Sequence, residues 1–421
     1  MKKVREGYKM SELGEIPEEW SIVKLSDLSQ KIGDGLHGTP KYVENSDYYF
    51  INGNNLVCGK VELYEDTKMV SEEDYIKNNK DLNENSLLIS LNGTIGNVAY
   101  YNNEKIMLGK SSGYINLKGN INKKYIYYVL KTNTVLEYFN KELTGTTIKN
   151  LSLSTLRNTP IPLPNIREQE KIALILSTVD EQIDNVDALI EKNKELKKGL
   201  MQTLLTKGIG HTKFKKTEIG EIPEKWEVKN VSDVAEKVCV GFVGSLNKYY
   251  TSSEKGIPMI RTTNLSQKGL LLKDLKYVTN EFHIKNKKSI VKKNDILVAR
   301  HGESGKACLV DCDIDANCLN IVIIRPDTNT INPQYLKEII NSESVIKQVN
   351  NSIVGSVQNV VNTKTIAELK MAIPSIEEQE KIVLILSEVD DKIEEYENKK
   401  QKLEELKKGL MQQLLTGRIR V

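Results

Sequence analysis

The chain contains an internal repeat, and this duplication constrains its fold more than any other feature. Residues 169–176 have the sequence QEKIALIL and residues 379–386 have QEKIVLIL, while LKKGLMQ occurs at both 196–202 and 406–412, so that both matches have an offset of 210 residues. GEIPEEW at 14–20 matches GEIPEKW at 220–226 with an offset of 206. Three matches in the same order predict a tandem duplication, in which a variable segment of roughly 150 residues precedes a closely matched segment of about 40.

Within the variable segments the two copies share a faint, collinear framework. Ile51-Asn52 and Asn55-Leu56 correspond to Ile260-Arg261 and Asn264-Leu265. Further matches relate Gly93-Thr-Ile-Gly96 to Gly302-Glu-Ser-Gly305, and Gly145-Thr146-Thr147 to Gly355-Ser356-Val357. The framework is shared, whereas the side chains that could face a ligand differ. Two related modules with different recognition surfaces explain this pattern, and ordinary sequence drift explains it equally well.

Composition narrows the class of protein. A chain of 421 residues with 39% hydrophobic and 28% charged residues is expected to form two or three domains with real cores. It has no run of about 18 apolar residues, which a membrane-spanning helix needs. No apolar stretch follows the basic N-terminal residues, which argues against a signal peptide. Five unevenly placed cysteines favour a reduced, cytoplasmic protein.

Charge is distributed unevenly along the chain. The net charge is only +3, which excludes a globally basic protein that coats DNA. The excess lies in residues 209–376, which hold 24 basic and 18 acidic side chains. This excess permits a nucleic-acid surface there without requiring one, because runs of charge are usually solvated surface.

The two matched segments are predicted to be long paired helices. Their apolar residues alternate in steps of four and three, which is the period of a coiled coil; they are Ile172, Leu176, Val179, Ile183, Val186 and Ile190 in the first copy and Ile382, Leu386, Val389, Ile393 and Tyr396 in the second. Polar residues then interrupt the projected seam at Asn193, Lys197, Lys400 and Lys407. Asn165 and Ser375 suit the helix starts, and Gly208 and Gly417 suit the ends. About 40 residues give a rod of roughly 60 Å, and we expect the two copies to pair within the chain as an antiparallel coiled coil.

The variable segments mix strands with short helices. Strands are expected at 48–51, 86–91, 97–101 and 114–117, and at 257–261, 295–300, 307–310 and 319–325 in the second copy. Helices are expected at 125–136 and 335–349. The predicted fold is therefore α+β, with a small β-sheet or barrel and short helices in each module. Four segments follow: modules at 1–164 and 209–374, and long spacer helices at 165–208 and 375–421.

At this point the chain resembles the specificity subunit of type I restriction–modification systems. The resemblance covers nearly all of the chain and is carried by Glu-Gln-Glu-Lys-Ile at 168–172 and 378–382, the two LKKGLMQ blocks, the two GEIPExW entries and Asp34-Gly35 with His37-Gly38-Thr39-Pro40. The paired helix blocks in this order are a specific signal, whereas the Gly-x-x-Gly loops alone are weak.

The resemblance implies a function. Such subunits have two target-recognition domains, each of which binds one half of a split, asymmetric site in double-stranded DNA. Two long helices separate the domains and dock two methyltransferase subunits, and motor-nuclease subunits join the complex. The resemblance implies that this chain is not catalytic, and that methyl donor, ATP and Mg²⁺ belong to the partners. Modules on one side of a duplex are expected to lie about one helical turn, roughly 34 Å, apart.

Candidate DNA-contacting residues lie in the turn-rich loops, where Arg, Lys, Asn and Thr side chains offer the donors that read base edges and phosphates. In the first module they are His37, Thr39, Lys41, Tyr42, Asn52, Asn54, Asn92, Thr94 and Thr146. In the second module they are Lys248, Tyr249, Arg261, Thr263, Asn264, Arg300, His301, Ser304, Lys306, Ser356 and Gln358. Structural roles remain open for several; Arg261 and Asn264 also suit hydrogen bonds at the end of a strand.

Catalytic and metal-binding alternatives have weak support. Asn332-Pro-Gln-Tyr335 resembles the Asn-Pro-Pro-aromatic motif of adenine methyltransferases, but the equivalent Asn122-Lys-Lys-Tyr125 lacks proline, which favours a helix start. Cys308, Cys312 and Cys318 lack the paired spacing of a zinc site, so no metal is expected. Two rival hypotheses remain, a self-sufficient DNA methyltransferase and a coiled-coil scaffold that does not bind DNA.

Overall fold

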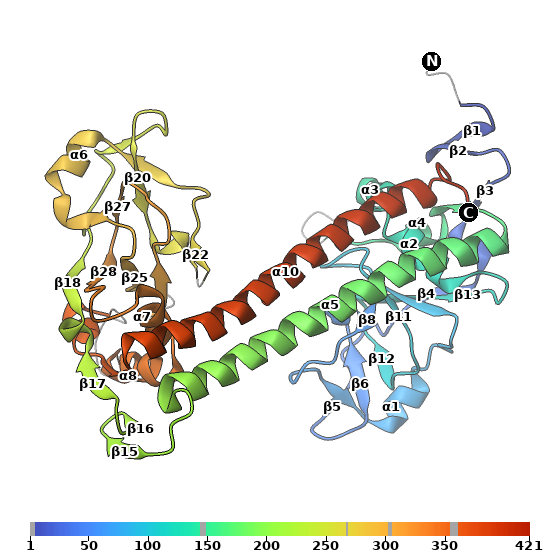
Figure 1. Ribbon diagram of the computed structural model, residues 1–421. Coiled ribbons are helices and arrows are strands. Elements are labelled where there is room, and N and C mark those ends of the chain that lie inside the picture. The colour runs from blue at the N-terminus through green and yellow to red at the C-terminus, as the bar shows by residue number, and fades with distance from the viewer. Residues whose placement is uncertain (1–4, 144–148, 267, 302–304, 354–360) are drawn as a thin grey trace. The chain divides into compact units, whose positions relative to one another are not determined.

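The computed structural model describes residues 5–143, 149–266, 268–301, 305–353 and 361–421 (Figure 1). The chain divides into two compact units, the first formed by Met1–Asp187 with Asn398–Val421 and the second by Ala188–Glu397. Each unit therefore contains one variable module, the N-terminal part of the long helix that follows this module and the C-terminal part of the other long helix.

The first unit contains two four-stranded sheets. The order of the first sheet is β11-β10-β13-β4, with antiparallel pairing of β4 (Ser29–Asp34), β10 (Ser86–Ser90), β11 (Val98–Tyr100) and β13 (Ser112–Leu117). The second sheet has the order β12-β6-β9-β5 and consists of β5 (Tyr42–Val43), β6 (Tyr48–Ile51), β9 (Met69–Val70) and β12 (Ile106–Leu108). Strand β12 runs parallel to β6. All five residues of β10 are buried, because this strand lies inside its sheet.

The second unit repeats this arrangement. Its four-stranded sheet has the order β18-β28-β25-β26 and consists of β18 (Ala235–Val240), β25 (Ile296–Ala299), β26 (Ala307–Leu309) and β28 (Ile321–Pro326). A five-stranded sheet has the order β19-β23-β20-β27-β24 and consists of β19 (Tyr250–Thr251), β20 (Ile257–Ile260), β23 (Lys276–Val278), β24 (Ile290–Val291) and β27 (Ala316–Cys318). The α+β prediction is confirmed, and the sheets in the described parts of both modules are small and open rather than closed into barrels.

Two-stranded pairs and short helices complete the modules. In the first unit they are β1 (Tyr8–Ser11) with β2 (Gly14–Pro17), β3 (Ser21–Lys24) with β14 (Pro160–Leu163), β7 (Leu56–Val57) with β8 (Lys60–Val61), α1 (Glu72–Lys77) and α4 (Leu153–Arg157). In the second unit they are β15 (Phe214–Thr217) with β16 (Gly220–Pro223), β17 (Glu227–Asn230) with β29 (Lys370–Ile373), β21 (Leu265–Ser266) with β22 (Gly269–Leu270), α6 (Asn280–Lys285) and α9 (Thr363–Ala367).

The helix expected over 125–136 is wrong as a single element. The structure has α2 (Lys123–Leu130) and α3 (Asn133–Lys141) in its place. The break occurs because the side chain of Thr132 accepts a hydrogen bond from the backbone N–H of Val135, and this cap starts a new helix. The helix expected over 335–349 is likewise α7 (Pro333–Ile340) followed by α8 (Glu343–Ile353), with the Ser342 hydroxyl donating to the carbonyl of Ile339 at the break.

The two long helices are α5 (Ile166–Lys207) and α10 (Ile376–Leu414). The predicted caps are present, since Asn165 accepts a hydrogen bond from the N–H of Glu168 at 3.1 Å and Ser375 accepts one from Glu378 at 3.4 Å. Helix α10 ends at Leu414, before the predicted limit of 421, and a turn with Gly417 at φ 66° follows it. No helix in the described ranges is both long and apolar enough to cross a membrane.

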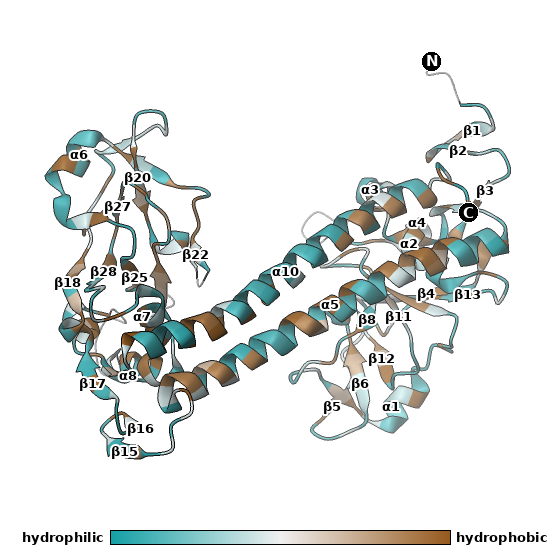
Figure 2. Cartoon of the chain, in the orientation of Figure 1, coloured by the Kyte–Doolittle hydropathy of each residue, from teal (hydrophilic) through white to brown (hydrophobic). Residues whose placement is uncertain are grey.

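In the first unit the two helices pair in opposite directions. Lys400 forms an ion pair with Asp187 at 2.7 Å, and Lys407 forms one with Asp180. As the residue number rises along α10, the partner's number falls along α5, so the predicted antiparallel pairing is confirmed. Figure 2 shows apolar and polar residues interspersed along both helices. The lysines that interrupt the apolar seam are thus tied to aspartates of the neighbouring helix.

A tryptophan joins each module to the start of the long helix that follows it. The indole N–H of Trp20 donates to Glu168 at 3.1 Å, and that of Trp226 donates to Glu378 at 3.0 Å. Both tryptophans are 1% exposed. The GEIPExW and EQEKI motifs therefore recur together because one supplies the donor and the other the acceptor of the same hydrogen bond, which is buried in the first unit and partly buried in the second.

Candidate nucleic-acid interface

In the first unit, backbone hydrogen bonds gather four loops into one cluster. Leu36, after β4, donates to the carbonyl of Leu108 at 2.7 Å, and Gly109, after β12, donates to Ile51 at 2.8 Å. Leu91, after β10, donates to the carbonyl of Ser111 at 2.9 Å. The loops that follow β4, β6, β10 and β12 are therefore neighbours, and they contain most of the predicted contacts of this module. We call residues 35–41, 52–55, 91–97 and 109–111 the first loop cluster.

The second unit builds the same cluster at equivalent positions. Phe242 donates to the carbonyl of Cys318 at 2.9 Å, and Leu319 donates to Ile260 at 2.8 Å. The hairpin loop after β25 closes in the same way as the loop after β10, because the N–H of Gly305 donates to the carbonyl of Ala299 at 2.9 Å. The second loop cluster comprises the described residues of 241–249, 261–264, 300–306 and 319–320.

One glycine in each cluster is required by close packing. A Cβ atom on Gly35 would lie 2.2 Å from the carbonyl oxygen of Leu108, and one on Gly241 would lie 2.5 Å from that of Cys318. Any side chain there would push the first loop away from the neighbouring strand. These glycines fix the distance between the loops in both copies.

The asparagines Asn55 and Asn264 occupy equivalent turns and are only 4% and 2% exposed. The side-chain oxygen of Asn264 accepts from the N–H of Arg261 at 3.1 Å, and its amide donates to Leu271 and Lys273. Asn55 makes the corresponding bonds with Asn52 and Glu62. Asn264 is also a predicted DNA contact, and both polar atoms of its side chain take part in the hydrogen bonds that shape this turn.

The residue that begins each of these turns differs between the copies. Asn52 is half-buried and its side-chain oxygen accepts a hydrogen bond from the Ser111 hydroxyl at 2.9 Å. At the equivalent place Arg261 is also half-buried, and its Nη2 atom donates to the carbonyl of Asp274 at 3.0 Å. The two turns are built alike, and an amide in one copy is replaced by a guanidinium in the other.

A second difference lies in the hairpin loops, where Leu91 corresponds to Arg300. Arg300 is half-buried, its Nε atom donates to the carbonyl of Val361 at 3.0 Å and its Nη1 atom donates to the side chain of Asn320 at 2.7 Å. Leu91 is buried at 3% exposure. Arg300 therefore ties two loops of the second cluster together through its side chain, which leucine cannot do.

Apart from Tyr42, which lies in β5, the remaining described candidates of the first module lie on its loops with unequal exposure. The exposed ones are His37, Thr39, Lys41, Tyr42, Asn54 and Thr94, and Asn92 is half-buried. His37 pairs with Asp34 at 2.6 Å, and the hydroxyl of Thr94 donates to the carbonyl of Gly53 at 3.2 Å. Both contacts hold polar side chains at the surface of the first loop cluster.

In the second module the exposed candidates are Lys248, Thr263 and His301, while Tyr249 and Lys306 are half-buried. The ring of Tyr249 packs 5.0 Å from that of Phe282, which favours a packing role for its aromatic face. Four candidates, Thr146, Ser304, Ser356 and Gln358, lie outside the described residues.

Sequence reasoning missed two polar residues of the clusters, Ser111 and Asn320. Each lies in the short connection between two strands, where Ser111 bonds to Asn52 and Asn320 bonds to Arg300. Ser111 precedes the strand expected at 114–117, whereas Asn320 falls inside the strand expected at 319–325, which begins at Ile321 in the structure.

The structure explains the motifs that suggested catalysis or metal binding. Asn332 caps α7 by accepting from the N–H groups of Gln334 and Tyr335, and Tyr335 is fully buried with its hydroxyl donating to Ala372. Cys308 and Cys318 are buried, and burial raises the pKa of the Cys308 thiol to about 11. Among the described residues, no group of three or more His, Cys, Asp or Glu side chains is arranged to hold a metal ion.

Known proteins share this architecture. The family model described as type I restriction modification DNA specificity domain matches residues 17–197 and again residues 223–405. The specificity subunit of the type I restriction enzyme MjaVIII from Methanocaldococcus jannaschii is 28% identical over 423 residues, covering 96% of this chain and 94% of that protein. The EcoBI specificity subunit from Escherichia coli is 30% identical over 278 residues, covering 62% of this chain and 57% of that protein.

Solved structures show the same fold. The S subunit of a type I restriction–modification system from M. genitalium has a TM-score of 0.58 at 18% identity, covering 94% of this chain and 96% of that chain. A chain from a structure concerning complex assembly of a type I restriction–modification system also has a TM-score of 0.58, at 13% identity, covering 96% of this chain and 99% of that chain. With two matches that together span most of its length, this chain belongs to the type I restriction–modification DNA specificity family and carries two copies of the family's domain.

Proposed function

We propose that this chain selects the DNA site of a type I restriction–modification complex, and that each loop cluster binds one half of a bipartite, asymmetric site. The observation that carries the proposal is the contrast between shared framework and changed side chains. The turns of Asn55 and Asn264 make the same hydrogen bonds, whereas the residues that begin them are Asn52 and Arg261. Equivalent loops with different donors suit two modules that bind different base sequences.

The chemistry of the clusters suits DNA. Amide side chains pair with adenine and guanidinium groups pair with guanine, while lysine and hydroxyl side chains contact phosphates. Exposed groups of the first cluster include Lys41, Asn54 and Thr94; in the second, Lys248 and Thr263 are among the exposed groups and Lys306 is half-buried. We propose that these six residues supply contacts, and that Arg300 positions the loop that carries His301 and Lys306.

The long helices have two proposed tasks. They hold the two modules at a set spacing, so that the unspecified gap between the half-sites has a constant length. They also dock two methyltransferase subunits, and a motor-nuclease subunit joins that assembly. Methyl transfer, ATP hydrolysis and their cofactors belong to those partners in this proposal, and the chain contributes site selection.

The experiment is to co-express this chain with its cognate methyltransferase and to map methylated bases in the host DNA by single-molecule sequencing. A motif with two short specified ends and an unspecified centre supports the proposal. A chimera in which the second module is replaced by that of a relative is expected to change one end only. A change in both ends would contradict the assignment of one half-site to each module.

Two rivals predict other results. A self-sufficient methyltransferase would methylate DNA when supplied with methyl donor and no partner. A scaffold without DNA contact would leave the methylated motif unchanged when residues of the loop clusters are substituted.

A further inference from the structure

The loops that follow β4 and β18 are equivalent in the two modules. Leu36 forms a parallel backbone bridge with Gly109, directly after β12, and Phe242 forms one with Leu319, directly after β27. The offset between Leu36 and Phe242 is 206 residues, the same as the offset between the two GEIPExW motifs. The residues that come next in the two loops therefore occupy matching places.

The next residue differs in chemistry between the two copies. In the first module it is His37, whose side chain is 65% exposed and whose Nε2 atom lies 2.6 Å from the Oδ2 atom of Asp34. In the second module it is Val243, which is 59% exposed. One loop position thus presents an imidazole ring in one module and, in the other, an isopropyl group that can neither donate nor accept a hydrogen bond.

The backbone on both sides of Val243 is held by contacts within the second unit. The carbonyl of Phe242 accepts a hydrogen bond from the N–H of Asn320 at 2.8 Å, and the ring of Phe242 packs edge-on against that of Phe282 at 4.9 Å. Gly244 follows at φ 148°, a conformation that other residues rarely adopt. The loop is therefore in place before a ligand arrives, and a β-branched side chain has little rotamer freedom to lose on binding.

Val243 differs from its surroundings in polarity. Burial does not account for a valine here, because most of its surface faces solvent. The other exposed side chains among the described residues of the second loop cluster are polar, and they are Ser245, Asn247, Lys248, Thr263 and His301. An apolar group among side chains suited to DNA suggests contact with an apolar feature of DNA.

The base edges in the major groove offer one such feature, the C5-methyl group of thymine. The side chains that open the minor groove as wedges are mostly longer or bulkier, such as phenylalanine, leucine and methionine. The methyl groups of valine extend only one carbon beyond Cβ. A short, well-placed apolar side chain therefore suits contact with a thymine methyl better than insertion between base pairs.

We propose that Val243 contacts the C5-methyl group of a thymine in the half-site of the second module. This inference rests on the proposed function and specifies one chemical feature that the module reads. His37, at the matching place, offers hydrogen bonding instead, so the same loop position selects base pairs by different chemistry in the two modules. The half-site of the second module therefore includes at least one A·T pair.

The test removes the methyl group from the DNA and the isopropyl group from the protein in turn. Each thymine of the half-site that module exchange assigns to the second module is replaced singly by deoxyuridine, which keeps the hydrogen-bonding edge and lacks only the methyl group. Fluorescence anisotropy at one salt concentration gives the affinity of each duplex for the complex of this chain with its methyltransferase. Thymines of the other half-site, replaced in the same way, are an internal control.

The variant is Val243→Ala. Its matched control is Ile284→Ala in α6, at an apolar residue of the same unit that is 58% exposed and lies outside the loop cluster. Circular dichroism checks that both variants are folded, and native mass spectrometry checks that both hold the same methyltransferase subunits as the wild-type chain.

For the wild-type chain and the control, one deoxyuridine substitution is expected to weaken binding about fourfold, which is the effect of one buried methyl group. For Val243→Ala, the thymine and deoxyuridine duplexes are expected to bind about equally at that position. Substitutions in the other half-site should have the same effect on all three proteins.

A wild-type complex that is indifferent to deoxyuridine throughout the second half-site would overturn the inference, and so would a half-site without an A·T pair. Weaker binding of Val243→Ala to both duplexes with the fourfold difference retained would also overturn it, because the contact would then lie elsewhere. Loss of methyltransferase from the Val243→Ala complex would do the same. The proposed function survives these outcomes as long as the methylated motif is bipartite, whereas the absence of a bipartite motif with the wild-type chain would refute that function itself.

Discussion

The Nζ atom of Lys197 lies 2.7 Å from the Oδ2 atom of Asp390 on the other long helix. The equivalent residues of the repeat with their roles exchanged, Lys407 and Asp180, form the corresponding ion pair in the first unit. The internal repeat is therefore present in the ion pairs between the long helices as well as in the modules. Each copy supplies a lysine for the aspartate of the other.

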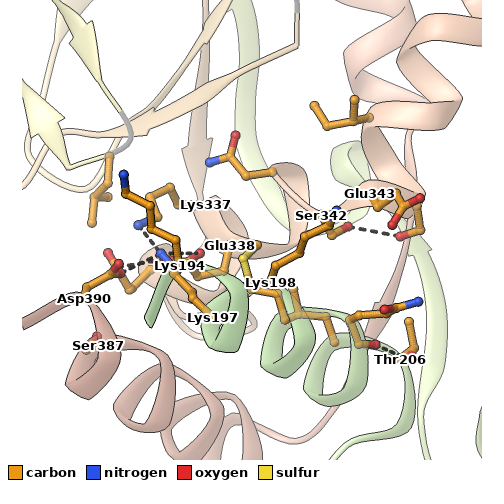
Figure 3. Close-up of a pocket in the computed structure, with 18 of the residues that line it drawn as sticks. Lys194, Lys197, Lys198, Thr206, Lys337, Glu338, Ser342, Glu343, Ser387 and Asp390 are labelled. Atoms are coloured by element: carbon orange, nitrogen blue, oxygen red, sulfur yellow. Dashed lines mark hydrogen bonds and ion pairs between the residues drawn. The ribbon is translucent and has the colours of Figure 1, made fainter. Parts of the chain in front are cut away.

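Because it is more buried, the ion pair of Lys197 should contribute more to the free energy of unfolding than the ion pair of Lys400. The side chain of Lys197 is 18% exposed and also lies 3.7 Å from Glu338, which is 3% exposed. Lys197→Met is expected to lower the free energy of unfolding by about 1–3 kcal/mol, because it removes one of the two lysines, Lys197 and Lys337, beside the buried carboxylate of Glu338 (Figure 3). Lys400→Met, at a pair that is 33% and 45% exposed, is expected to cost less than about 1 kcal/mol. Urea denaturation compares the two, and equal losses would contradict this ranking.

The indole hydrogen bonds of Trp20 and Trp226 should stabilise both units. Trp20→Phe and Trp226→Phe keep most of the ring while removing the N–H that donates to Glu168 and Glu378. Each substitution is expected to cost about 1–3 kcal/mol, because a carboxylate that is buried (Glu168) or partly buried (Glu378) loses a donor. Thermal unfolding followed by circular dichroism gives the measurement. A Tm unchanged in either variant would show that the bond is not needed there.

The cysteines should differ in reactivity. Burial raises the pKa of Cys308 to about 11 and that of Cys318 further, so neither has an appreciable thiolate fraction at pH 8. Cys58 is exposed. Brief treatment with iodoacetamide at pH 8 is expected to modify Cys58 and to spare Cys308 and Cys318 until the protein is unfolded. Mass spectrometry of the peptides tests this, and rapid labelling of Cys318 in the folded chain would contradict its burial.

Residues of the second loop cluster should affect DNA binding without affecting assembly. Lys306→Ala is expected to weaken binding to all sequences and to reduce the slope of log affinity against log salt by about 1, because it removes one phosphate contact. Arg261→Ala is expected to cost about 1–3 kcal/mol and to relax the sequence requirement at one end of the site. Fluorescence anisotropy of the assembled complex measures both. Loss of the complex itself would instead assign these residues a structural role.

The sequence predicted the long helices well because their burial follows a simple period. The apolar positions from Ile172 to Ile190 fixed both the element and its pairing face. It did not predict the break between α2 and α3, because apolar residues at helical spacing continue on both sides of the short polar run Lys131-Thr-Asn-Thr134 that contains the cap at Thr132.

The candidate site was predicted more coarsely than the helices. The loops were identified, because turn residues and polar side chains cluster in them. Which side chains face outward was not, since an asparagine that shapes a turn has the same sequence signature as one that contacts a base. Asn264 shows the difficulty, because its side-chain amide forms hydrogen bonds with the backbone of Arg261, Leu271 and Lys273. Ser111 and Asn320 were missed because the sequence does not show which polar loop residues bond to other residues of the cluster.

The most direct test of the central claim is the methylation map of DNA from cells that carry this chain with its methyltransferase. Two modules of one framework with different side chains predict a motif with two short, dissimilar specified ends and a gap of constant length. A single continuous motif, or one that stays the same when the second module is exchanged, would contradict the account.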